Sequence, residues 1–419
     1  MSTQEPNQFQ TVDEAKAAIA RQLQPVSEHR CVAIRDALNQ VLAEPILSPI
    51  DVPSHDNSAM DGYAFSGSSI EPAGLTKLQV VGTALAGNKF TGSVGTGQCV
   101  RIMTGAVMPN GCDTVVVQEN VSSPENGFIQ FAPGAVSAGD NRRLKGEDLT
   151  QGKPALPAGK VIRPADLGLL ASLGVPEVKV KRTLRVAFFS TGDELRSLGQ
   201  PLDEGCVYDS NRYTLYGMLR RLEFVEPIDM GVVHDSPEAL EKAMCEAASQ
   251  ADVILTSGGV SVGEADFTKT VMQKLGAVNF WKIAMRPGRP MAFGQITNPA
   301  DGRSAVLFGL PGNPVAVMVT FYAFVRDALH HLAGAQPRPL PTVTARLAQG
   351  VRKKAGRTEY QRVWLERDAQ GWVAHLTGAQ GSGVLRSMSE ADGLLVLHHE
   401  QGSLNAGDLG EVWPFEGLI

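Results

Sequence analysis

Cysteine is scarce in this sequence: five cysteines lie scattered among 419 residues, and no two of them form a C-x-x-C pair. This pattern argues against a disulfide framework and against a zinc ribbon, and it fits a reducing compartment. No apolar run reaches the length of a membrane span, and the first residues lack the basic and apolar regions of a secretory signal. We therefore expect a cytoplasmic protein with no membrane partner.

An excess of positive charge is also missing. The formal net charge is −6 at pH 7, whereas a nucleic-acid-binding surface usually appears as a basic excess. Hydrophobic residues make up 43% and charged residues 20% of the chain, which is ordinary for a globular protein. The composition thus predicts no nucleic-acid partner, and the length predicts about two to four domains.

Three common motifs are absent: G-x-x-x-x-G-K-[ST], G-x-G-x-x-G after a strand, and H-E-x-x-H. Their absence argues against a P-loop NTPase, a Rossmann dinucleotide domain and a zincin protease. One match remains, because "GVSVG" at residues 259–263 fits the G-x-S-x-G nucleophile elbow of hydrolases. The later histidines lie in helical or β-rich segments rather than in a loop of the same domain, so a serine hydrolase is the weaker alternative.

Changes in the local pattern of helical, β-prone and glycine-rich segments divide the chain into four predicted domains. Residues 1–55 and 150–182 combine helical and short β segments, and we expect one elongated, discontinuous helical/β domain. Residues 56–149 alternate β-prone runs with glycine, which predicts an inserted β domain. Residues 183–332 alternate strands and helices, and residues 333–419 return to β-prone runs that predict a C-terminal β-barrel-like domain.

The predicted fold class is multidomain α/β plus β, with a doubly wound, mostly parallel sheet at residues 183–332. Runs such as "LRVAFFS", "ADVILTS" and "SAVLFGL" are mostly apolar, as expected of strands covered on both faces by helices. "PVAVMVTFYAFVRDALHHL", residues 314–332, is apolar nearly all round, and we interpret it as a buried helix of this layer.

Unusual loops follow several strands of the α/β domain, where an open α/β sheet binds its ligands. They read "STGDEL", "TSGGVSVGEAD" and "GLPGNP", and the basic segment "WKIAMRPGRP" follows a fourth strand. Glycine amides suit phosphate, and Mg²⁺ is held by one or two carboxylates together with phosphate oxygens. The loops therefore predict a site for a phosphorylated ligand and Mg²⁺, although each loop alone could be an ordinary turn or helix cap. The predicted ligand-binding residues are Thr191, Gly192, Ser257, Gly258, Gly259, Ser261, Gly263, Lys282, Pro311, Gly312, Asn313 and Pro314.

Eight motifs, taken in order, resemble the molybdopterin molybdenumtransferase family, which includes the corresponding domain of gephyrin, and the resemblance spans about residues 11–414. Eight motifs in sequence are far more specific than any single glycine turn. The motifs are "DVPSHDNSAMDGYA", "RIMTGAVMPNGCDTVVVQE", "GEDL", "FSTGDEL", "YDSNRY", "TSGGVSVGEADFTK", "WKIAMRPGRPMAFG" and "GLPGNPVAVMVTF".

The resemblance implies a reaction in which adenylylated molybdopterin and molybdate give molybdenum cofactor and AMP, with Mg²⁺ as cofactor. It also implies an elongated homodimer, in which the β insertion of one subunit faces the sheet domain of the other, and an upstream molybdopterin adenylyltransferase as partner. Two rival functions remain open: a metal-dependent hydrolase of nucleotide pyrophosphates and, less favoured, a non-catalytic scaffold.

Site roles follow from the resemblance residue by residue. It implies Glu194 and Asp266 as metal ligands. It implies catalytic roles for Asp61, Thr104, Asp148, Glu194, Asp235 and Asp266, and molybdate contacts for Arg286, Arg289, Pro290, Arg362 and Ser382.

The sequence departs from the family pattern in two places. Arg286 and Arg289 stand where many members have lysine, and Ala316 stands where many have serine. A guanidinium is a planar fork whereas an ammonium is a point charge, so we expect the molybdate geometry to differ in detail.

Overall fold

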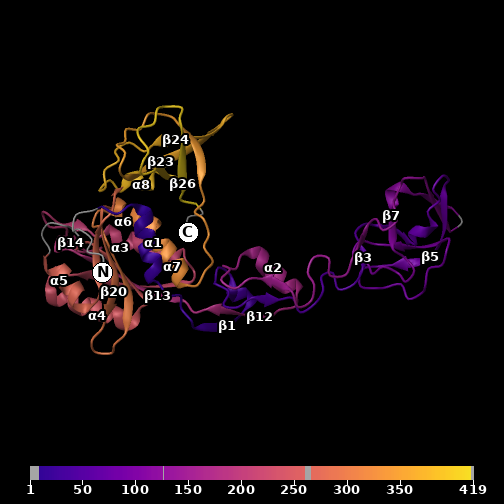
Figure 1. Ribbon diagram of the computed structural model, residues 1–419, viewed down its shortest axis with the longest axis horizontal. Helices are drawn as coiled ribbons and strands as arrows, with labels where there is room; N and C mark the ends of the chain where they lie inside the picture. The colour runs from indigo at the N-terminus through magenta and orange to yellow at the C-terminus, as the bar shows by residue number, and fades with distance from the viewer. Residues whose placement is uncertain (1–8, 126, 260–265, 417–419) are drawn as a thin grey trace. The chain divides into compact units, whose positions relative to one another are not determined.

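The computed structural model describes residues 9–125, 127–259 and 266–416, without the side chains of residues 123–125, 266 and 267. The chain forms two compact units, each with its own core (Figure 1). The first comprises residues up to 43, 159–164 and 177 onward, and the second comprises residues 44–158 and 165–176. The four domain boundaries expected from the sequence stay predictions.

A six-stranded sheet in the order β16-β13-β17-β21-β20-β18 forms the centre of the first unit. The first four strands are parallel, whereas β20 is antiparallel to both β21 and β18. Because β18 and β21 therefore run the same way, the segment between β18 and β20 lies at the edge where the carboxyl ends of β13, β17 and β21 meet. The strands are β13 Leu184–Thr191, β16 Val225–Val233, β17 Val253–Ser257, β18 Val278–Lys282, β20 Pro290–Thr297 and β21 Ser304–Leu310.

Helices cover both faces of this sheet, so the predicted doubly wound, mostly parallel fold is confirmed. One face packs against α1, α3, α6 and α7, and the other against α4 and α5. The predicted buried helix at residues 314–332 is present, but a π-helical turn, Phe321–Val325, separates its two α-helical parts. The helices are α1 Val12–Gln22, α3 Ser210–Arg220, α4 Pro237–Gln250, α5 Asp266–Leu275, α6 Pro314–Thr320 and α7 Arg326–Leu332.

The C-terminal strands close into a five-stranded barrel, in agreement with the barrel-like fold expected there. Each strand pairs with two others around the ring β23-β24-β22-β26-β25, and the pairing of β25 with β23 closes it. The short strand β19, Met285–Arg286, attaches to β23 and so ties the barrel to the basic segment. The barrel elements are β22 Val343–Leu347, β23 Thr358–Asp368, β24 Gly371–Leu376, α8 Arg386–Ser389, β25 Gly393–Leu397 and β26 Leu409–Pro414.

Two short strand pairs complete the first unit. The pair of β1 and β12 is antiparallel, and the pair of β14 and β15 is parallel and follows the first glycine loop. The elements are β1 His29–Ala33, the 3-10 turn Ile34–Ala37, β12 Glu177–Lys181, β14 Leu195–Arg196 and β15 Val207–Tyr208.

The second unit contains a six-stranded sheet in the order β7-β4-β6-β5-β9-β8, which gives the β insertion expected from the sequence. Apolar side chains fill both faces of this sheet. Two small antiparallel pairs, β2 with β11 and β3 with β10, and one helix complete the unit. The elements are β2 Ile46–Leu47, β3 Asn57–Ser58, β4 Gly62–Phe65, β5 Thr76–Ala84, β6 Gln98–Ile102, β7 Thr114–Val117, β8 Ser122–Glu125, β9 Phe128–Phe131, β10 Arg142–Arg143, β11 Pro154–Leu156 and α2 Pro164–Ser172, with 3-10 turns at Gly67–Ser69 and Gln118–Asn120.

Within the described part of the chain, no helix is both long and apolar enough to span a membrane.

One ion pair joins the amino-terminal end of β17 to the amino-terminal end of β13. Arg182 donates two hydrogen bonds to the Asp252 carboxylate, at 2.7 and 2.8 Å, and the same carboxylate accepts from the backbone N–H of Arg185 at 2.8 Å. Both side chains are partly buried. We expect Asp252→Ala to lower the free energy of unfolding by about 1.5–3 kcal/mol, because charge-assisted hydrogen bonds are lost. Chemical denaturation measures this change.

The pair of exposed Lys274 and half-buried Glu241, which joins two surface helices, provides the control for this variant. We expect Glu241→Ala to change the free energy of unfolding by less than about 1 kcal/mol, as is usual for surface ion pairs. Equal effects of the two variants would contradict the special role given to Asp252.

Candidate functional site

The loops that follow β13, β17 and β21 lie side by side at one edge of the sheet. The backbone N–H of Gly258 donates to the carbonyl of Leu310 at 3.1 Å. A Cβ built on Gly258 would lie 2.6 Å from the carbonyl oxygen of Thr191, so no larger residue fits without displacement. Gly258 also has φ +94°, a conformation that favours glycine. The loops predicted to bind one ligand are therefore brought together.

The basic segment between β18 and β20 lies at the same edge. Gly288, with φ +99°, packs closely on α6, because a Cβ there would lie 2.6 Å from the hydroxyl of Thr320. Arg286 and Arg289 are exposed, while Lys282 and Pro290 are half-buried. The Arg289 guanidinium stacks over the Phe9 ring at 5.2 Å.

Arg362 of the barrel is a fully buried cation. It donates to the hydroxyl of Ser387 and to the carbonyls of Ala379, Gln380 and Gly381, at 3.0–3.2 Å. No carboxylate in the described part of the chain pairs with it. Burial and the neighbouring Arg286 lower the pKa of Arg362 to about 10, so it stays charged at neutral pH. A buried charge without a counterion favours an anion nearby.

Ser382 belongs to the same barrel loop and joins it to the sheet domain. Its carbonyl accepts a hydrogen bond from the backbone N–H of Val315 at 3.1 Å, in the first turn of α6. The loop ordered by Arg362 is therefore docked directly beside Pro311, Gly312, Asn313 and Pro314.

Acidic side chains gather on the other side of the glycine loops. Asp193 and Glu194 follow β13, and Asp235 follows β16. The Asp193 carboxylate accepts from the backbone N–H of Asp235 at 3.1 Å. Partial loss of hydration, together with the negative charges of Asp193 and Glu194, raises the pKa of Asp235. The cluster would therefore be stabilised by a cation.

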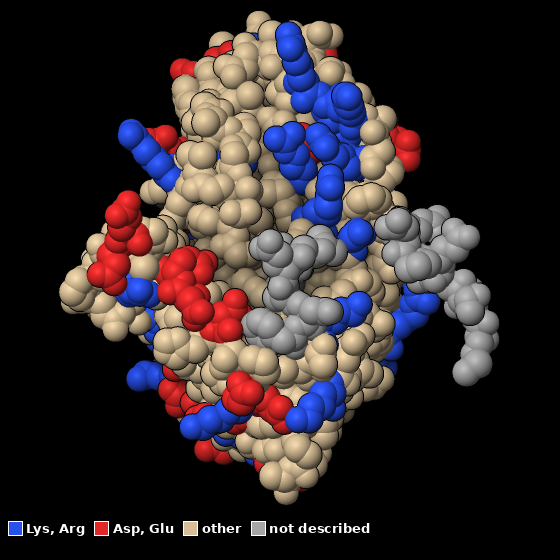
Figure 2. Space-filling model, turned by 90° about the vertical axis from the view of Figure 1, so that its left-hand side faces the viewer, with Lys and Arg blue, Asp and Glu red and all other residues tan. Residues whose placement is uncertain are grey.

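Figure 2 shows a hollow on this face of the molecule. Lys and Arg side chains gather above the hollow, and a group of Asp and Glu side chains lies to its left. A ligand in such a hollow would meet both signs of charge.

The metal site predicted from Glu194 and Asp266 is only half described. Asp266 begins α5, but its side chain lies outside the described residues, as do Ser261 and Gly263. Among the residues that are described, no three His, Cys, Asp or Glu side chains are grouped so as to hold a metal ion. The exposed carboxylate of Glu194 fits the usual Mg²⁺ arrangement, in which one or two carboxylates act together with phosphate oxygens. The serine of the "GVSVG" elbow, Ser261, is likewise outside the described residues.

Three predicted residues belong to the second unit. The carboxylate of Asp61 accepts from both the backbone N–H and the hydroxyl of Thr104, at 2.7 Å each. These bonds lower the pKa of Asp61. Asp148 is exposed, and its backbone N–H donates to the carbonyl of Val52. Asp61 and Thr104 are thus directly paired, whereas Asp148 lies in a bend just before Leu149, which forms an isolated β-bridge with Val52.

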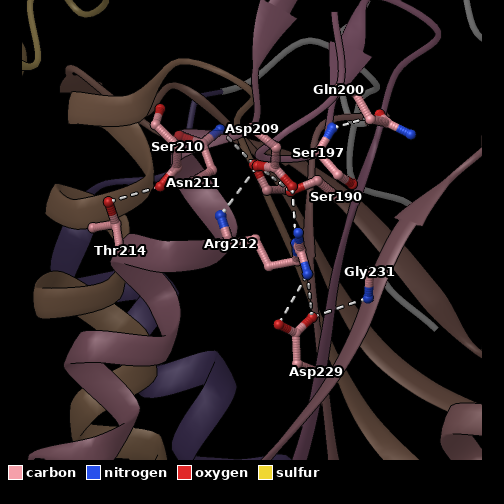
Figure 3. A network of polar contacts seen from close by, with 11 residues as sticks. Ser190, Ser197, Gln200, Asp209, Ser210, Asn211, Arg212, Thr214, Asp229 and Gly231 are labelled. Carbon is pink, nitrogen blue, oxygen red and sulfur yellow. Dashed lines mark hydrogen bonds and ion pairs between the residues drawn. The ribbon is translucent and has the colours of Figure 1, made fainter.

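The residues of "YDSNRY" had no predicted role, yet they form a polar network beside the glycine loops. Asp209 caps α3, accepts a hydrogen bond from Ser190 at 3.0 Å and pairs with Arg212 (Figure 3). Arg212 also pairs with Asp229 of β16. Asn211 is buried and contacts both Ser257 and Gly312. The only signal for these residues in the sequence was the motif itself.

Family comparisons cover nearly the whole chain. Residues 10–174 match the MoeA N-terminal region (domains I and II), residues 187–331 match a probable molybdopterin binding domain, and residues 344–415 match the MoeA C-terminal region (domain IV).

Individual relatives agree with these matches. A molybdopterin molybdenumtransferase from Haemophilus influenzae is 42% identical over 98% of this chain and 99% of its own. One from Nostoc is 36% identical over 89% of this chain and 80% of its own. A crystal structure of a molybdopterin biosynthesis moeA protein from Pyrococcus horikoshii is 27% identical, covers 97% of this chain and 100% of its own, and superposes with a TM-score of 0.81. With this similarity along its whole length, the chain belongs to the molybdopterin molybdenumtransferase family.

Proposed function

We propose that this protein transfers molybdenum from molybdate to adenylylated molybdopterin, releasing AMP and giving molybdenum cofactor. One observation carries the proposal. The glycine loops after β13, β17 and β21 meet at one edge of the sheet, with basic residues and an acidic cluster beside them. This is the arrangement that a substrate with a pyrophosphate and an oxyanion co-substrate require.

The glycine loops hold the pyrophosphate of the substrate in this proposal. Gly258 and Gly259 have positive φ, so their backbone can approach a ligand where a side chain would obstruct it.

Cations from two parts of the first unit receive molybdate. The exposed guanidinium groups of Arg286 and Arg289 attract the dianion, and Arg362 supplies positive charge from a buried site. Four hydrogen bonds fix Arg362, so its charge needs no reorganisation when the anion arrives.

The acidic cluster fits Mg²⁺, with Glu194 and Asp266 as ligands. The ion would neutralise phosphate charge and orient the phosphates for displacement of AMP. Asp193 and Asp235 would strengthen this site by their negative charge.

We include a homodimer in the proposal because the family resemblance implies one. Asp61, Thr104 and Asp148 belong to the second unit, whereas the loops belong to the first. The two hydrogen bonds from Thr104 hold the Asp61 carboxylate in one orientation. In the proposed dimer, this carboxylate contributes to the cleft of the other subunit. We place the reaction in the cytoplasm, after an adenylyltransferase that supplies the substrate.

The direct test is to incubate the purified protein with adenylylated molybdopterin, molybdate and Mg²⁺. We expect AMP release to depend on molybdate and to equal the molybdenum incorporated. Liquid chromatography measures AMP, and metal analysis measures incorporation. AMP release without incorporation would indicate a pyrophosphate hydrolase instead.

The Mg²⁺ assignment is tested by Glu194→Gln. This change keeps the shape of the side chain and removes its charge. We expect the Mg²⁺ concentration for half-maximal transfer to rise by about tenfold, equivalent to about 1.4 kcal/mol. Asp203→Asn is the matched control, because Asp203 is an exposed acid of the neighbouring loop that pairs with Arg196. An unchanged Mg²⁺ dependence in Glu194→Gln removes Glu194 from the metal site.

A shared cleft is tested by mixing inactive variants. The assay holds Mg²⁺ well below the concentration that Glu194→Gln needs, so that Asp61→Asn and Glu194→Gln each retain little activity alone. We expect the mixture to recover roughly a quarter of wild-type activity after subunit exchange, because half of the dimers carry one intact cleft. Differently tagged subunits measure the exchange. No recovery in proven mixed dimers would place both residues in a cleft of one subunit.

A further inference from the structure

Asn211 lies between two of the glycine loops. Its side-chain amide donates to the hydroxyl of Ser257 at 2.7 Å and to the carbonyl of Gly312 at 2.6 Å. Ser257 ends β17, and Gly312 follows β21. A single amide group therefore bridges the ends of two neighbouring strands at the candidate site.

The orientation of this amide is set by its partners. The carbonyl of Gly312 can only accept, so the Nδ2 side of Asn211 must face it. The Oδ1 atom is then buried, with no hydrogen-bond partner in the described part of the chain. A buried acceptor without a partner is unfavourable for stability alone. This cost suggests that the bridge serves another purpose.

The backbone around Asn211 is firmly held. Asp209 caps α3 and accepts hydrogen bonds from Ser190 of β13 and from Arg212 (Figure 3). Arg212 in turn donates to Asp229 of β16 at 2.9 and 3.0 Å. The start of α3 is thus tied to two strands, and Asn211 extends this fixed frame to the two glycine loops.

We propose that Asn211 is a positioning residue for the transfer reaction, and this inference rests on the function proposed above. It sets the spacing between residues 257–259 and residues 311–314, which hold the phosphate groups of the substrate. It touches no reacting atom. Without the bridge, the two loops separate, and a small misplacement of bound phosphate is enough to slow the displacement of AMP.

Asn211→Asp tests this role because aspartate keeps the shape and loses the donors. We expect kcat to fall about 10- to 100-fold, as for misplaced reacting groups, while the KM for molybdate changes little. Hydrogen exchange followed by mass spectrometry should show faster exchange in residues 256–259 and 309–315. Asn211→Ala, which introduces no buried charge, should behave in the same way.

Asn298 provides a matched control. It is buried to the same extent, its amide donates to Ser249 at 3.2 Å, and it follows β20 at the opposite edge of the sheet. We expect Asn298→Asp to lower the melting temperature without changing kcat or exchange in the two loops. Wild-type kcat and exchange in both Asn211 variants, or an equal loss of kcat in Asn298→Asp, would overturn the inference. If the wild-type protein transfers no molybdenum, the proposed function fails. The rate of hydrogen exchange in the two loops of the Asn211 variants still decides whether Asn211 positions these loops.

Discussion

The candidate site depends on a close contact between backbones at Gly258. The backbone N–H of Gly258 donates a hydrogen bond to the carbonyl of Leu310. On its other side, the carbonyl oxygen of Thr191 lies so close that there is no room for a side chain. Since the residue also has positive φ, glycine is required for two separate reasons. The loops after β13, β17 and β21 can approach one another only because of this contact.

Charge is arranged around that contact in two separate groups. The acids follow β13 and β16, whereas the cations come from the segment after β18 and from the barrel. Arg362 is the extreme case, since it is buried and its side chain has only carbonyl and hydroxyl partners among the residues that the structure describes. A substrate that carries a pyrophosphate, a separate oxyanion co-substrate and a divalent ion would together satisfy both groups, which is the chemistry that we propose for this family member.

The barrel contributes to the site through its loop rather than through its core. Arg362 orders residues 379–381, and Ser382 binds the first turn of α6. Strand β19 makes a second link, because it joins the basic segment to β23. These two connections fix the barrel to the edge of the sheet where the glycine loops lie. Without the barrel, the basic segment would lose its strand pairing with β23.

Local sequence patterns were enough to predict the alternation of strands and helices, the β insertion, the barrel-like C-terminal domain and the loops that form the candidate site. Those features follow from local patterns such as apolar runs, glycine turns and caps. The sequence did not reveal the reversed strand β20, the bridge made by Asn211 or the buried state of Arg362. Each of these depends on which strands become neighbours and in what register, and such pairings join residues far apart in the chain. They appear only in the folded chain, because no local pattern encodes the partner of a strand or of a buried polar group.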